Sequence, residues 1–197
     1  SYSKPLMTHT PTILSTYNSN TLKQLKNPYT GNVSQGMWQV ANTVIDVYDL
    51  NLNKIKEIHG VNVECYDSFH CDTHITIKEQ KYLSLYASMI EVCGGHILHD
   101  QYSVGILRNV HQESTMGKFM KTIDYLGNVV HMSFWIRLKN GNAYVYDELH
   151  GHALTFSMME LSIHERAHHD VTEYNPDAGH CDEYQMWYNS MLQTSIR

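Results

Sequence analysis

The chain has 197 residues, of which 42% are hydrophobic, and a formal net charge of −6. This size suits one compact domain with a buried core, and since no apolar run reaches 18 residues, no transmembrane helix is expected. The acidic balance argues against nucleic acid as the primary partner, because DNA and RNA binding depends on a basic surface. Contact with nucleic acid through a local patch, such as Arg137 with Lys139, stays open.

The cysteines indicate the redox setting of the chain. Cys65, Cys71, Cys93 and Cys181 are too few for a disulfide framework in a domain of this size. We therefore predict reduced thiols and an intracellular (cytoplasmic or nuclear) or virion location. The first residues lack the apolar stretch of a signal peptide, so we expect neither secretion nor a membrane partner.

The first part of the chain differs in composition from the rest. Residues 1–33 are polar and aperiodic, which predicts an extended arm that reaches assembly partners. Residues 34–197 form a single predicted domain, which carries the motifs described below.

Hydrophobic periodicity predicts an α+β fold, in which a small mixed sheet with a hairpin packs against helices. Asn140 and Gly141 suit the tight turn of the hairpin, and Gly94 and Gly95 suit a helix end. In chain order, the predicted elements are a helix near 34–48, strands at 61–65 and 74–78, a helix at 78–93, a strand at 102–110, an irregular segment at 111–128, a β-rich segment at 129–138, its partner strand at 143–147, and helices at 154–172 and 181–194.

The chemistry of the chain is concentrated in the sequence His164-Glu165-Arg166-Ala167-His168. Residues four apart lie on one face of a helix, so the imidazoles of His164 and His168 can bind one metal ion. From the adjoining edge, Glu165 reaches a water bound to the metal and is the predicted general base. Chance predicts roughly 0.05 such patterns in this composition, so the position of the motif on a predicted helix adds necessary support.

A catalytic zinc ion needs a third protein ligand, and His180 is the predicted one. It follows a turn-rich stretch that can fold back over the preceding helix. His169 and Glu173 are rival third ligands, and Asp177 or Asp182 is a candidate to orient a ligand imidazole. A second, structural zinc at Cys65, His70, Cys71 and His74 is a weaker alternative, because that spacing is not typical of a zinc finger.

The segment from Trp135 to Leu192 resembles the SprT-like and WLM-type zinc metalloproteases, a minimal, gluzincin-like HExxH protease domain. The resemblance is carried by Ile136-Arg137-Leu138-Lys139, by the HExxH motif, and by Gly179-His180 with Tyr184 where the family has Phe. It implies zinc ligation by His164, His168 and His180 and general-base catalysis by Glu165. Arg166 stands where the family normally has an uncharged residue.

The predicted function is therefore that of a zinc-dependent metallopeptidase, with Glu165 assisting the attack of a zinc-bound water on a peptide bond. A peptide substrate would pair with the strand at 143–147, near Tyr144 and Tyr146. The alternative is a catalytically inactive structural or virion component that retains the metal site. A DNA-associated repair protease is a third class, and the high Asn, Tyr and Ile content fits an AT-rich genome such as that of a large DNA virus.

Overall fold

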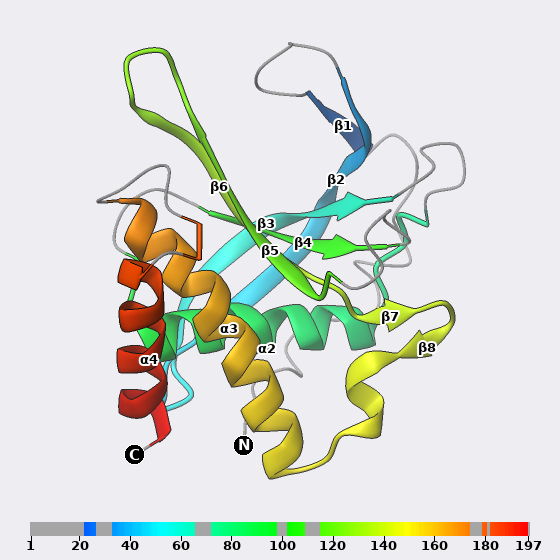
Figure 1. Cartoon of the computed structure of the whole chain (residues 1–197). Helices are drawn as coiled ribbons and strands as arrows, with labels where there is room; N and C mark the ends of the chain where they lie inside the picture. Colours follow the sequence, from blue (N-terminus) through cyan, green and yellow to red (C-terminus); the bar gives the residue numbers. More distant parts are fainter. Residues whose placement is uncertain are drawn as a thin grey trace.

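The computed structural model describes residues 22–26, 33–65, 72–97, 102–108, 115–173, 179–180 and 182–196. A six-stranded mixed sheet, a two-stranded sheet and three α-helices make up this part of the chain, which confirms the predicted α+β class (Figure 1). The elements are β1 Leu22–Lys26, β2 Val33–Tyr48, β3 Lys54–Glu64, α2 Ile77–Gly94, β4 Ser103–Leu107, β5 Gly117–Ile123, β6 Val129–Ile136, β7 Lys139–Asn140, β8 Ala143–Tyr144, the 3₁₀ helix η3 Val145–Glu148, α3 His152–Thr172 and α4 Asp182–Ile196.

The large sheet has the strand order β1-β2-β3-β4-β6-β5. The first three strands are antiparallel, β4 is parallel to both β3 and β6, and β5 pairs antiparallel with β6. Helix α2 makes the crossover between the parallel strands β3 and β4. The order leaves β5 at one edge of the sheet, next to α3.

The helix expected near 34–48 is wrong, because these residues belong to the long strand β2. Val40, Ile45 and Val47 are buried core residues, and β-branched side chains favour strands. The register with β3 shifts between Val40 and Val44. Such an irregularity breaks the two-residue alternation of a strand, and here it leaves apolar spacings that imitate a helix.

The predicted polar arm is only partly described. Within it, Leu22–Lys26 form strand β1 and pair with β2. Residues 1–21 and 27–32 lie outside the described residues.

Helix α2 confirms the helix predicted at 78–93, and its start overturns the strand predicted at 74–78. Thr76 caps the helix: its hydroxyl accepts from the backbone of Glu79, whose carboxylate accepts in return from the backbone N–H of Thr76. This capping box fixes where the helix begins. At the other end the chain leaves the helix at Gly95, with φ +82°.

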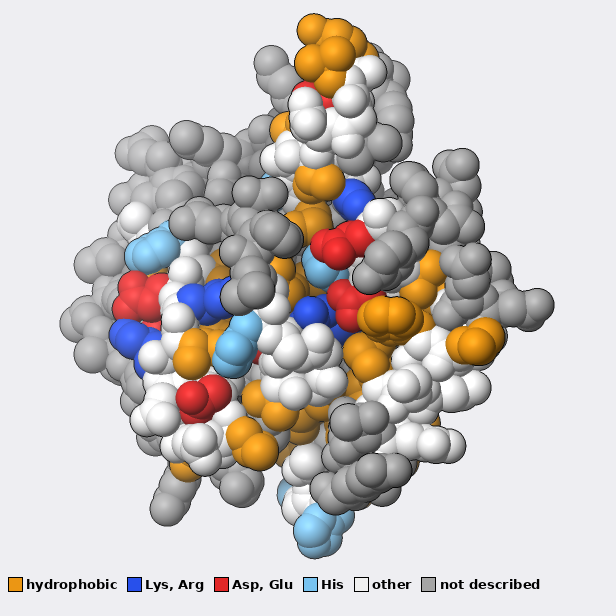
Figure 2. Space-filling model, turned by 90° about the vertical axis from the view of Figure 1, so that its left-hand side faces the viewer, with side chains coloured by type: hydrophobic (Ala, Val, Ile, Leu, Met, Phe, Trp, Pro, Cys, Tyr) orange, Lys and Arg blue, Asp and Glu red, His pale blue; other side chains and the backbone are white. Residues whose placement is uncertain are grey.

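Strand β5 overturns the irregular segment predicted at 111–128, since Gly117–Ile123 pair along their length with β6. The strands predicted at 102–110 and 129–138 are confirmed as β4 and β6. The β5–β6 hairpin projects from the sheet, and apolar side chains gather at its tip (Figures 1 and 2). Tyr125, Leu126 and Val130 are exposed there.

The second predicted hairpin is present but shorter than expected. Asn140 pairs with Ala143 around Gly141, whose φ of +60° suits glycine. The strand predicted at 143–147 is wrong beyond Tyr144, because residues 145–148 form η3. The segment at 143–147 was also predicted to pair with the 129–138 strand, which is β6. It does not, because β6 pairs with β4 on one side and with β5 on the other.

The three helices pack together against the sheet (Figure 1). Helix α3 lies across α2 and beside β5, and α4 packs on α3, so the helices predicted at 154–172 and 181–194 are both confirmed. Ile163 and Ala167 face the core with exposed fractions of 0%, which leaves the opposite side of α3 free to form a site. Among the described residues, no helix is long and apolar enough to cross a membrane.

The state of the cysteines differs from the expectation of reduced thiols. Cys65, which follows β3, is disulfide-bonded. Cys93 on α2 is not disulfide-bonded, and Cys71 and Cys181 lie outside the described residues.

Candidate metal centre

Three imidazoles converge on the outer side of α3. His164 and His168 lie one turn apart on α3, and His180 lies immediately before α4. Nε2 of His180 is 3.1 Å from Nε2 of His168 and 3.3 Å from Nε2 of His164. Within the described parts of the chain, this is the group of His, Cys, Asp or Glu side chains that could hold a metal ion.

The distances from His180 to the other two imidazoles fit a tetrahedral zinc ion. Zinc–nitrogen bonds of 2.0–2.1 Å at tetrahedral angles place two ligand nitrogens roughly 3.3 Å apart. Burial, reinforced by the neighbouring histidines, lowers the pKa of His168 to about 4 and also lowers the pKa of His164. Both imidazoles are therefore neutral at pH 7, the state in which they bind a metal without first losing a proton.

Tyr184 contacts two of these histidines. Its ring is stacked on the His168 ring, with centroids 4.4 Å apart at 23°, and its hydroxyl donates to the backbone carbonyl of His164 at 3.0 Å. In the sequence, Tyr184 stands where the family that the chain resembles has Phe, which predicts no role for it. Its place four residues after His180, in the first turn of α4, is the signal that could have linked it to the site.

Glu165 is buried beside these histidines, with an exposed fraction of 2%. Among the described residues, its carboxylate accepts no hydrogen bond and forms no ion pair, and burial raises its pKa to about 8. Gly117 at the start of β5 faces it: a Cβ added there would lie 2.9 Å from Oε2 of Glu165. The glycine therefore keeps the space in front of this carboxylate open.

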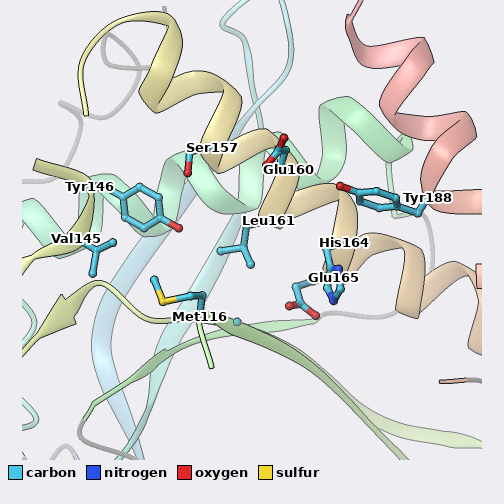
Figure 3. Close-up of a pocket in the computed structure, with 10 residues that line it drawn as sticks. Met116, Val145, Tyr146, Ser157, Glu160, Leu161, His164, Glu165 and Tyr188 are labelled. Carbon is cyan, nitrogen blue, oxygen red and sulfur yellow. The ribbon is translucent and has the colours of Figure 1, made fainter. Parts of the chain in front are cut away.

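A pocket of about 390 Å³ opens in front of Glu165 (Figure 3). Helix α3 forms one wall, and Tyr146 points its hydroxyl into the pocket from the other side. The lining residues are Met116, Gly117, Val145, Tyr146, Ser157, Glu160, Leu161, His164, Glu165 and Tyr188. Apart from the motif residues and Tyr146, the sequence analysis missed this lining, since most of it comes from segments far apart in the chain.

Of the two predicted substrate-binding tyrosines, the structure brings only Tyr146 to the pocket. It is buried on η3, and burial raises its pKa to about 12. Tyr144 does not line the pocket: its hydroxyl pairs with Thr76 at 3.2 Å, and Lys78 and Lys139 lie over its ring.

The rival third ligands lie away from the histidine cluster. His169 is buried between Phe119 and Phe134, and its Nδ1 is 2.6 Å from a carboxylate oxygen of Asp170. Glu173 pairs with His169 instead, at 3.6 Å. Asp177 lies outside the described residues, and the side chain of Asp182 is not among those described.

Arg166, the unusual residue of the motif, points away from the metal-binding face. Its guanidinium donates to the backbone carbonyls of Ile90 and Gly95, where α2 ends, and to Asp170. The cation thus satisfies carbonyls at the negative end of α2. Its role is to fix α3 against α2, which explains why a charged residue can stand inside the motif without disturbing the site.

The alternative zinc site finds no support among the described residues. Cys65 is disulfide-bonded, and His74 is exposed ahead of α2. The other two candidates, His70 and Cys71, lie outside the described residues.

Comparison with known proteins gave no match. No family model, no curated protein and no solved structure matches this chain.

Proposed function

We propose that this chain is a zinc-dependent metallopeptidase. The observation that carries the proposal is the convergence of the three Nε2 atoms of His164, His168 and His180 beside a buried glutamate that has no partner among the described residues. Perturbed, unpaired acids in a pocket are typical of catalytic sites. The resemblance to SprT-like and WLM-type proteases supports the same activity.

In this proposal the three histidines hold zinc, and Glu165 is the general base. A bound zinc ion supplies a Lewis acid and lowers the pKa of water at the site. The positive charge beside Glu165 also favours its ionised form, so the carboxylate can take a proton from the attacking water. Glu165 then passes this proton to the leaving amine, and Gly117 leaves the room that the exchange requires.

The substrate would lie along β5 rather than along the strand predicted at 143–147. Strand β5 is paired with β6 on one side only, and its first residue lies opposite Glu165. A peptide that adds to this edge gains main-chain hydrogen bonds irrespective of its side chains. Such pairing would carry the backbone past the pocket.

Zinc content is the first test of the proposal. We expect about one zinc per chain by elemental mass spectrometry in the wild type, and a large loss in His180→Ala. His59→Ala is the matched control, because His59 is exposed on β3. If the wild type takes up no zinc after reconstitution, the proposal is wrong.

Turnover is the second test, because a metal site alone does not make an enzyme. Glu165→Gln should keep its zinc and lose roughly 10²- to 10⁴-fold in peptide hydrolysis. A zinc-loaded wild type that cleaves no peptide would favour the alternative, a structural or virion component that retains the site. Salt-dependent DNA binding by an active enzyme would instead favour a DNA-associated protease.

A further inference from the structure

The pocket extends from the histidine cluster toward the start of α3. Ser157, Glu160, Leu161 and His164 all line it, and their spacing of three and four residues places them on one face of the helix. Glu160 is one turn before His164, about 6 Å along the helix axis. A side chain that enters beside Glu165 can therefore extend along α3 as far as Glu160 (Figure 3).

Three apolar side chains line this path. Leu161 lies on the α3 side, Val145 on the opposite side, and Met116 between them, next to β5 (Figure 3). The polar groups of the lining are the hydroxyls of Ser157, Tyr146 and Tyr188, the imidazole of His164 and the carboxylates of Glu160 and Glu165. An apolar passage that ends near a charged group suits a long side chain with a polar head, because the stem loses contact with water while the head keeps a partner.

The charged side chains that line the pocket, Glu160 and Glu165, are both acidic, and no Lys or Arg is among the described residues that line it. Glu160 is exposed, and no ion pair or hydrogen bond to another described residue occupies its carboxylate.

We propose that the pocket binds the side chain of an arginine or lysine next to the cleaved bond, with its cationic head paired to Glu160. The stem would pack on Met116, Val145 and Leu161. The inference rests on the proposed function, because a cleaved bond requires peptidase activity. Binding of the cationic side chain in the pocket does not require cleavage and can be tested separately. It makes Glu160 the residue that determines substrate specificity.

The kinetic test uses peptides that differ at one position, placed in turn on either side of the cleaved bond. Arginine, citrulline, leucine and glutamate are compared there, since citrulline keeps the shape of arginine without its charge. We expect kcat/KM to be about tenfold higher for arginine than for citrulline. Glu160→Gln should bring that ratio close to one, and Glu160→Lys should favour the glutamate peptide. Glu148→Gln, an exposed glutamate outside the pocket lining, is the matched control.

A binding measurement separates this inference from the proposed function. The zinc-loaded Glu165→Gln chain is titrated calorimetrically with the arginine and citrulline peptides, with and without Glu160→Gln. Tighter binding of arginine that depends on Glu160 supports the pocket assignment even if the wild type cleaves nothing. If the enzyme is active, equal kcat/KM for the arginine and citrulline peptides overturns the assignment. If it is inactive, equal affinity for the two peptides does so.

Discussion

Helices α2 and α3 both carry buried glutamates, but only those on α2 are paired with a described cationic side chain. On α2, Glu79 lies 2.8 Å from the guanidinium of Arg108, and Glu91 lies 2.5 Å from the ammonium of Lys56. On α3, Glu165 is buried to a similar degree, yet it has no such partner among the described residues. Since a buried charge is costly unless it is paired, the two on α2 stabilise the fold, whereas the one on α3 marks the candidate site.

The largest expected effect comes from neutralising the paired glutamate and the unpaired one in turn. Glu79→Gln leaves the Arg108 charge buried without its partner, which should reduce the free energy of unfolding by about 3–5 kcal/mol. Glu165→Gln should leave it unchanged or increase it, because no partner is lost. Urea unfolding of the metal-free proteins at pH 7 measures both. If the two substitutions lower the free energy of unfolding equally, Glu79 and Glu165 do not differ in their contribution to stability.

Arg166→Met should have the next largest effect. It removes a buried cation from Asp170 and from the carbonyls that end α2, at a cost of about 2–4 kcal/mol. Zinc content should stay at the wild-type value, because the guanidinium lies on the side of α3 that faces α2. Lys78→Met is a control in which a surface ion pair, with Asp147, is lost. Loss of zinc from a folded Arg166→Met protein would contradict this separation of roles.

The pH dependence of stability gives a smaller effect. Burial raises the pKa of Glu165 to about 8 in the metal-free protein, so the folded chain keeps a proton that the unfolded chain has released. The contribution of Glu165 to stability should therefore fall as pH rises from about 4.5 toward 8, by roughly 2.7 kcal/mol over two pH units. Thermal melts of the metal-free wild type and of Glu165→Gln isolate this term as their difference. A difference that does not change with pH would show that Glu165 titrates normally.

Sequence reasoning located the candidate ligands because their signal is local. Helix α3 follows from its apolar periodicity, and a four-residue spacing on a helix is enough to bring His164 and His168 together. The capping box that starts α2 was equally local, but alternation from Ile75 to Ile77 obscured it. Thr76 and Glu79 were the residues that could have revealed it.

The pocket could not be predicted in the same way. Its wall at Gly117 depends on β5 pairing with β6, and β5 is an edge strand whose lysines weaken the strand pattern. Lys118 illustrates this, because it reaches across to Glu64 and lies over the ring of Trp135. Contacts of this kind join residues that are far apart in the chain, so no local pattern records them.

The position of His180 ahead of α4 has a consequence for how this helix docks on the rest of the domain. His164 and His168 share one rigid helix, whereas His180 comes 12 residues after His168 from a separate segment. A metal ion bound by all three histidines would close the loop between His168 and His180. The loss of chain entropy on loop closure would be offset by the free energy of coordination. Zinc affinity and the docking of the last helix would then be one thermodynamic quantity. Metal removal should speed amide hydrogen exchange in α4 well before it affects the sheet.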